Sequence, residues 1–393
     1  MKTKMKNILE KVVPVLKTKA FVLSFLASFS VVAVLFAIAL IVSDVRNEIA
    51  NEEAFREFPT PPRTLWGPTP PEPEEEPCDL PPYPTLFSAL TGRRIYEGYA
   101  MRRPLAVVVN NIRASLPQSG IASADIVYEM LAEGDVTRFV AIFQSYIPEK
   151  IGSVRSARDY FVDFAWNHDA ILVFHGASPG GHTRIRNTGI TNLDGGRLEG
   201  QVFWRDRSFP EWVGNRGTRS LEHSSFTGRE RIEAHIESAG IRDLVGLNPA
   251  YGFQFGEIEQ QSIGTARRVV VPFSPNYTRT FIFDEEEQIY WVSNPAGPHL
   301  DAETEEQVAV TNILIQFAQM HSLGDYAGRR NINTLGEGRG YLATGGEQFP
   351  VRWQKSSHTS PTRWTFPDDT PITLSPGTTW VCVFQAGGSI LFE

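Results

Sequence analysis

The chain has 393 residues, of which 37 are lysine or arginine and 45 are aspartate or glutamate, for a formal net charge of −8. A net acidic protein repels bulk nucleic acid, so no nucleic-acid partner is expected. Two cysteines in a chain of this length exclude a disulfide scaffold as the source of stability.

The first element is an apolar segment, residues 20–42, whose only polar residues are three serines. About 20 apolar residues in a helix span the hydrocarbon core of a bilayer. Six lysines precede the segment and acidic residues follow it, and basic residues stay on the cytoplasmic side. The pattern predicts a single-pass cell-membrane protein with residues 1–19 in the cytoplasm and the bulk of the chain extracytoplasmic. The alternative is a cleaved signal peptide, which usually has a shorter apolar run.

Residues 43–101 form a linker rich in proline and glutamate. Such a segment buries too little apolar surface to fold and is expected to be an extended spacer. Residues 1–43 hold six lysines and one glutamate, which leaves 31 basic and 44 acidic residues, a charge of −13, in the rest of the chain. Only two of those basic residues are lysines, Lys150 and Lys355.

The remaining residues are long enough for two domains, and their patterns differ. Residues 102–248 predict a mixed α/β domain, and residues 249–393 predict a mostly β domain, so the fold class is α+β. In the first half we predict strands at 104–109, 125–132, 137–144 and 170–174 and helices at 156–168, with Ser156 as N-cap, and at 226–239. In the second half we predict strands at 269–273, 279–283, 288–293, 311–317, 341–344, 350–354, 372–374 and 379–384. The part outside the membrane is expected to be soluble and monomeric.

Several blocks of the sequence resemble the bacterial YerB-like envelope family, a domain of unknown function (3048) with N- and C-terminal domains. The blocks are PLAVVVNN (104–111), QSG (118–120), ADIVYE (124–129), EGDVTRF (133–139), IFQS (142–145), IGSVRSAR (151–158), GPHLD (297–301) and PGTTWV (376–381). The resemblance spans residues 102–392 and implies a two-domain envelope protein without a known reaction. Family members are often lipoproteins, whereas this chain has a predicted transmembrane anchor and no lipid-accepting cysteine.

The densest group of charged residues in the first half lies at predicted strand ends. It comprises the arginines Arg138, Arg155 and Arg158 and the acids Glu129, Asp135 and Asp159. Arginines beside a helix N-terminus form a natural anion site, and the alternative is a buried salt-bridge network. The order of strand, turn and VRSARD (154–159) resembles the LytR-type phosphotransferases, which implies arginines that grip a lipid pyrophosphate.

Histidines supply the other candidates. His175 and His182 flank residues 176–181, a predicted glycine-rich loop that contains Ser178 and that could hold an anion. His299 and Asp301 lie in a predicted turn, where such a pair binds metal, moves protons or, more often, caps the turn. The zinc-protease, zinc-ribbon and α/β-hydrolase motifs are absent from the sequence, so no metal or cofactor is expected.

Three functions remain open at this point. The first is a membrane-anchored extracytoplasmic protein that binds an anionic cell-envelope ligand or partner, such as a cell-wall polymer, a lipid head group or an envelope protein. The second is a transferase or hydrolase acting on a phosphate-bearing envelope substrate, and the third is a structural spacer. Catalysis requires polar groups that converge in one pocket, and a sequence does not show convergence. Binding is therefore the leading interpretation, and whether the protein is an enzyme stays open.

Overall fold

The computed structural model describes residues 85–209, 218–245 and 253–393. The predicted membrane segment (20–42), the basic segment before it and most of the linker lie outside these residues. The linker prediction is wrong for residues 85–101, which form two short strands and a short helix. Within the described ranges, no helix is long and apolar enough to cross a membrane.

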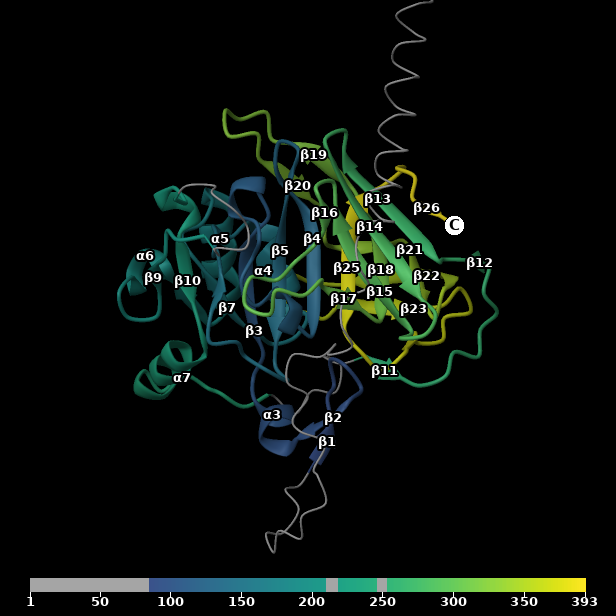
Figure 1. The fold of residues 1–393 in the computed structure, drawn as a ribbon, viewed down its shortest axis with the longest axis horizontal. Helices are drawn as coiled ribbons and strands as arrows, with labels where there is room; N and C mark the ends of the chain where they lie inside the picture. The colour runs from purple at the N-terminus through teal and green to yellow at the C-terminus, as the bar shows by residue number, and fades with distance from the viewer. Residues whose placement is uncertain (1–84, 210–217, 246–252) are drawn as a thin grey trace, which may run out of the picture. The chain divides into compact units, whose positions relative to one another are not determined.

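The described part of the chain is mostly β with few helices, as expected of an α+β protein (Figure 1). The helices are α3 (Glu97–Met101), α4 (Asp159–Trp166), α5 (Pro179–Thr188), α6 (Gly195–Leu198) and α7 (Arg229–Ser238), with short 3-10 turns η1 (Arg113–Ser115), η2 (Ile121–Ser123) and η4 (Leu221–His223). The strands before residue 249 are β1 (Thr85–Phe87), β2 (Arg94–Tyr96), β3 (Leu105–Asn110), β4 (Ile126–Glu133), β5 (Val136–Phe143), β6 (Ile151–Gly152), β7 (Ile171–Phe174), β8 (Asn192–Asp194), β9 (Trp204–Arg205) and β10 (Ser225–Thr227). Those after it are β11 (Gln254–Phe255), β12 (Gly264–Thr265), β13 (Arg268–Ser274), β14 (Tyr277–Asp284), β15 (Ile289–Asn294), β16 (Gly297–Pro298), β17 (Ala309–Val310), β18 (Asn312–Ala318), β19 (Met320–Ser322), β20 (Arg330–Ile332), β21 (Gly336–Thr344), β22 (Glu347–Lys355), β23 (Arg363–Thr365), β24 (Thr373–Leu374), β25 (Thr379–Gln385) and β26 (Leu391–Phe392).

One eleven-stranded sheet contains strands from both halves of the sequence, in the order β12-β22-β21-β18-β25-β4-β5-β3-β7-β8 with β23 beside β22. The halves join where β25 pairs in parallel with β4, with Thr379 opposite Ile126 and Cys382 opposite Glu129. Figure 1 shows β25, coloured yellow, next to β4, coloured blue. The expected boundary between residues 248 and 249 therefore separates two sequence regions that share a sheet.

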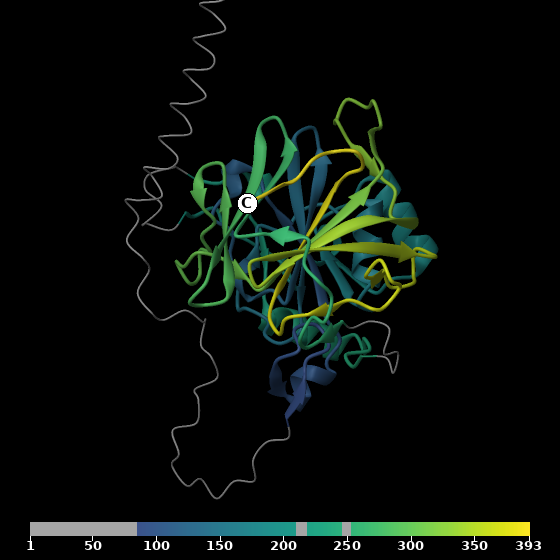
Figure 2. The same cartoon turned by 90° about the vertical axis from the view of Figure 1, so that its right-hand side faces the viewer.

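The core lies on both faces of this sheet. Along β3, Val107 and Val109 pack into one apolar cluster, while Ala106 and Val108 pack into another, because side chains alternate along a strand. The first cluster includes residues of a six-stranded sheet built from β13, β14, β15, β16, β17 and β26. In Figure 2 the strands β13 to β17 are green and β26 is yellow. The second includes the buried face of α4. A strand buried on both faces reads as a continuous apolar run, as β3 does.

The strands predicted for the second half are present, each within a few residues of its expected bounds. In the first half, the predicted helix 156–168 is α4, but its N-cap is Arg158, and Ser156 lies outside the helix. The predicted helix 226–239 is shorter, because Ser225–Thr227 form β10 between β6 and β9.

The predicted glycine-rich loop 176–181 is wrong over its second part, where α5 begins at Pro179. The side chain of Ser178 caps this helix by accepting a hydrogen bond from the Gly181 backbone N–H at 3.0 Å. Proline at the first helical position lacks only an N–H that would be unpaired there, so the local sequence starts a helix despite its glycines.

Candidate functional site

The parallel strands β3, β7 and β8 end at the same edge of the large sheet. Their register places Leu105 opposite Ile171 and Phe174 opposite Asp194, so Asn110, His175 and Asp194 lie at or just beyond neighbouring strand ends. In open α/β sheets, ligands bind outside the carboxyl ends of parallel strands. This edge is therefore the first place to look for a site.

The segment before α4 carries Arg155 across this edge. The Arg155 backbone N–H donates to the Val108 carbonyl at 2.9 Å, and its carbonyl accepts from the His175 N–H at 3.0 Å. The backbone of Arg155 thus lies between β3 and β7. Its guanidinium donates from Nη1 to the carbonyl of Glu222 at 2.9 Å.

Arg205, the last residue of β9, bonds to the same turn, η4, as Arg155 does. Its guanidinium donates from Nη1 to the Leu221 carbonyl at 2.8 Å and from Nε to the Glu199 carboxylate at 2.7 Å. The third nitrogen, Nη2, lies 3.1 Å from Nε2 of His175. We name Arg155, His175, Arg205 and their neighbour His223 the sheet-edge cluster.

His175 is the centre of the sheet-edge cluster, and its contacts define its protonation. A guanidinium only donates, so Nε2 of His175 accepts from Arg205, and Nδ1–H donates to the Ser225 hydroxyl at 2.9 Å. Burial and the neighbouring Arg205 lower the pKa of His175, consistent with a neutral ring. His175 therefore has no lone pair facing Ser225, and the two residues do not form a base–nucleophile pair.

Arg138 and Arg158, predicted to join Arg155 in an anion site, are instead committed to one carboxylate. Arg138 Nη2 lies 2.7 Å from one oxygen of Glu133, and Arg158 is ion-paired to the other. Both arginines are buried and also donate to backbone carbonyls of the segment before α4. The partner acid is Glu133, not Glu129, Asp135 or Asp159, so these two arginines fix the segment that carries Arg155.

The other predicted candidates do not gather around Arg155. Asp135 is exposed at the turn between β4 and β5, where it accepts from Asn276 at 3.1 Å. Asp159 begins α4 and lies 3.8 Å from Arg184. Ser178 caps α5, and His182 is exposed on the same helix.

Glu129 belongs to a buried polar centre that joins the two halves of the sequence. Its carboxylate accepts from Arg279 Nε at 2.8 Å and Nη2 at 3.0 Å, and from Trp380 Nε1 at 3.0 Å. Arg279 also lies 2.7 Å from Nδ1 of His299. All four side chains are sealed from solvent, so this centre is structural. Asp301 accepts separately from the N–H groups of Gly120, Ala122 and Glu303, so it caps a loop and does not pair with His299.

The burial of His299 predicts acid sensitivity. Desolvation, and then the charge of Arg279, hold the pKa of His299 well below 6.5. The unfolded chain binds this proton near pH 6.5, so below that pH the unfolded state is favoured and stability falls. We expect His299→Gln to reduce the loss of unfolding free energy between about pH 7 and about pH 5, by up to about 1.4 kcal/mol per pH unit, in urea titrations at each pH. His175 and His223 also have lowered pKa values and retain part of the slope in the variant. Equal slopes for the two proteins would contradict the prediction.

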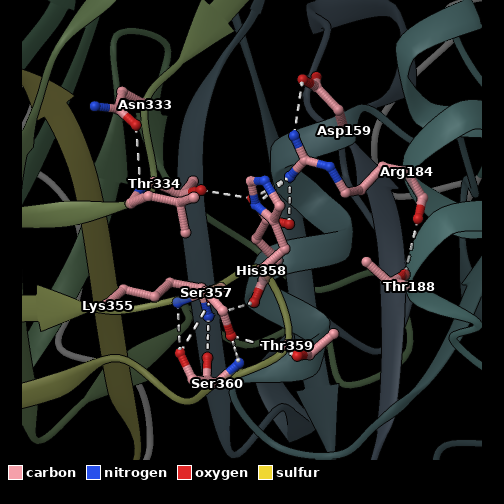
Figure 3. Close-up of polar contacts among 12 residues, drawn as sticks. Asp159, Arg184, Thr188, Asn333, Thr334, Lys355, Ser357, His358, Thr359 and Ser360 are labelled. Atoms are coloured by element: carbon pink, nitrogen blue, oxygen red, sulfur yellow. Dashed lines mark hydrogen bonds and ion pairs between the residues drawn. The ribbon is translucent and has the colours of Figure 1, made fainter.

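Figure 3 shows another polar centre, where the loop after β22 meets α4 and α5. Asp163 accepts from Arg184 Nη1 at 2.5 Å and from Thr334 at 2.5 Å, and it lies 3.1 Å from Nδ1 of His358. Burial lowers the pKa of the nearby Lys355 to about 8.

Lys355 uses its protons to hold this loop. Its ammonium donates to the Asp163 carbonyl at 3.2 Å, to Asn167 Oδ1 at 2.7 Å and to the Ser360 carbonyl. With all three protons donated to oxygens, the ammonium does not act as a base toward the serines around it. This centre therefore fastens the two halves of the sequence together, and the sheet-edge cluster remains the candidate site.

Sequence reasoning selected Arg155 and His175 but not His223. Arg205 lies in an arginine-rich stretch, and only pairing of β9 with β10 brings it to His175. His223 accepts a hydrogen bond from the Asn110 side chain at 3.1 Å. The two residues are 113 positions apart in the sequence, so a local pattern does not reveal this contact. Within the described ranges, no group of three or more His, Cys, Asp or Glu side chains is arranged to hold a metal ion.

Comparison with known proteins gives consistent matches. The N-terminal and C-terminal domains of the family "Protein of unknown function (DUF3048)" match residues 90–242 and 269–381. The chain is 34% identical over 301 residues to the Bacillus subtilis (strain 168) protein named "Putative lipoprotein YerB", covering 75% of this chain and 85% of that protein. A crystal structure of the YerB protein from Bacillus subtilis matches with a TM-score of 0.67 and 32% identity, over 78% of this chain and 99% of that one. These matches confirm the resemblance expected from the sequence blocks, and the chain belongs to the DUF3048 family.

Proposed function

We propose that the protein is a membrane-anchored, extracytoplasmic envelope protein that binds an anionic ligand or partner at the sheet-edge cluster. The apolar segment 20–42, with lysines before it and acids after it, supports the anchor and the orientation. The name of the Bacillus subtilis relative includes the word lipoprotein, which supports a location at a membrane surface although it points to a lipid as the anchor.

The observation that carries the binding proposal is the pair of partly exposed guanidinium groups at the carboxyl edge of the sheet. The Arg155 and Arg205 side chains are 22% and 28% exposed. Guanidinium groups bind phosphate and carboxylate through parallel hydrogen bonds, and they do so best when partly desolvated.

The acids around the cluster leave room for such a ligand. The Glu222 carboxylate is 3.9 Å from Arg155 and its side chain is 63% exposed, so this ion pair is weak. Glu199 binds Arg205 more closely but is also open to solvent. An incoming anion replaces these carboxylates, which then remain hydrated. The neutral His175 lines the cluster with a polar ring but does not act as a base toward Ser225. The geometry therefore supports ligand binding over catalysis.

The proposal predicts that the cluster binds a phosphate probe. We expect the full chain in detergent to bind inorganic pyrophosphate saturably, and Arg155→Gln to weaken binding about tenfold to about a hundredfold, the loss typical of one charge-assisted hydrogen bond. Equilibrium dialysis measures the affinity, and the thermal unfolding midpoint checks that the variant is folded.

The matched control is Arg186→Gln, because Arg186 lies on α5 and bonds only to Thr183 Oγ1 within the described structure. This control should bind pyrophosphate as the unmodified protein does. The proposal is contradicted if the unmodified protein does not bind, or if both variants lose affinity equally.

A further inference from the structure

A cleft of about 520 Å³ lies at the opposite end of β3 from the sheet-edge cluster. Its lining residues come from α3 and the residue after it, from the segment after β5 and from the first turns of α7: Tyr99, Arg102, Tyr146, Ile147, Glu149, Arg229, Glu230 and Glu233. Arg102 precedes β3, whereas Asn110 is its last residue and contacts His223 of the sheet-edge cluster. The cleft is therefore separate from the proposed anion site. Its size falls within the range of about 300–1,000 Å³ typical of small-ligand sites.

Two half-open tyrosine rings lie at the cleft. Tyr99 is 43% exposed and Tyr146 is 42% exposed. The Tyr99 ring contacts the Arg102 guanidinium, 4.6 Å from its centroid, and forms a T-shaped pair with the Tyr96 ring, with 5.5 Å between the ring centroids. Half-exposed tyrosines, which combine an apolar ring with a polar hydroxyl, suit ligands that are themselves amphipathic.

The polar groups of the cleft are paired across it but remain exposed. Arg102 lies 3.5 Å from Glu233, and Arg229 is ion-paired with Glu149. The Glu233 and Glu149 side chains are 51% and 59% exposed. These carboxylates accept hydrogen bonds from hydroxyl groups, and the guanidinium groups donate to ring and hydroxyl oxygens.

The charges of the lining narrow the class of ligand. Two arginines and three glutamates give the lining a formal charge of −1, which disfavours phosphate-bearing ligands. A purely apolar ligand would bury these charges without compensation. A sugar ring has apolar C–H faces to stack on tyrosine and hydroxyl groups to bond carboxylates and guanidinium groups. We propose that this cleft binds a neutral glycan chain.

The test uses the full chain in detergent with two probes, a tetramer of N-acetylglucosamine and an unmodified glucose tetramer, in calorimetric titrations. We expect saturable binding of at least one probe, and Tyr146→Ala to weaken it about tenfold, the loss expected when a stacking ring is removed. Tyr146→Phe should retain the affinity, because the ring remains. Tyr326→Ala is the matched control, since Tyr326 is 98% exposed and is not one of the residues that line the cleft.

Further measurements separate this site from the others. Arg155→Gln should leave glycan binding unchanged, so failure of the anion site does not affect this result. Raising salt from about 0.1 M to about 1 M should change the affinity little for a neutral ligand. The proposal is overturned if neither tetramer binds, if Tyr326→Ala loses as much affinity as Tyr146→Ala, or if Tyr146→Ala binds as the unmodified protein does. It is also overturned if a lysine oligomer binds the cleft and the sugar tetramers do not, with an affinity that falls in high salt, because the ligand would then be a cation.

Discussion

Replacing Arg279 with methionine is expected to lower the free energy of unfolding by about 3–5 kcal/mol, the loss typical when one partner of a buried ion pair is removed. Arg279 and Glu129 are both fully buried, and the guanidinium donates two hydrogen bonds to the carboxylate. Methionine fills part of the volume but leaves the carboxylate with only neutral donors such as Trp380. Urea denaturation followed by tryptophan fluorescence measures the change.

Two further variants make this result specific. Arg268→Met removes an arginine from β13, the strand that pairs with the Arg279 strand β14. Arg268 is ion-paired with Glu393, and both side chains are about half exposed, so the expected loss of unfolding free energy is about 0–1 kcal/mol. The double variant Glu129→Gln with Arg279→Met removes both charges and should recover part of the stability. Equal effects of Arg279→Met and Arg268→Met would show that the buried pair contributes no more than a surface pair.

Dividing the chain between residues 248 and 249 is expected to abolish folding of both pieces. In the large sheet, β25 lies between β18 and β4, with parallel pairing on both sides, so each fragment loses the neighbour of a central strand. The buried Glu129–Arg279 pair is also divided between the fragments. Each fragment should show no cooperative thermal transition by circular dichroism, and producing the two together should restore one. A cooperative transition in the fragment 249–393 alone would instead identify an independent domain.

The sequence predicted the strands well because their signal is local. Alternating or continuous apolar runs bounded by turn residues place β13, β18 and β25 close to their observed bounds. Residues 179–188 are harder to predict, because their glycines and proline are typical of a loop. They form α5 because Ser178 caps the helix and proline is favoured at the first helical position.

The candidate site was only partly accessible to sequence reasoning. Arg155 follows from its position beside a strand and before a helix, and the structure places it at the carboxyl edge of the sheet. The acid that neutralises Arg138 and Arg158 is Glu133, close in sequence but indistinguishable there from Asp135. The partner of Glu129 lies 150 residues away, at a distance where only the fold brings the charges together.

The central position of β25 has a consequence for the order in which the protein forms. Residues 379–385 are synthesised after all other strands of the large sheet, yet they pair with β4 and β18 on either side. Until they arrive, the edges of both neighbours present unpaired N–H and C=O groups, which attract other chains. Long-range parallel pairing is also slow. A polypeptide that stops before Thr379 therefore lacks the strand that covers both β4 and β18, so two edges that are paired in the complete chain stay open to association with other chains.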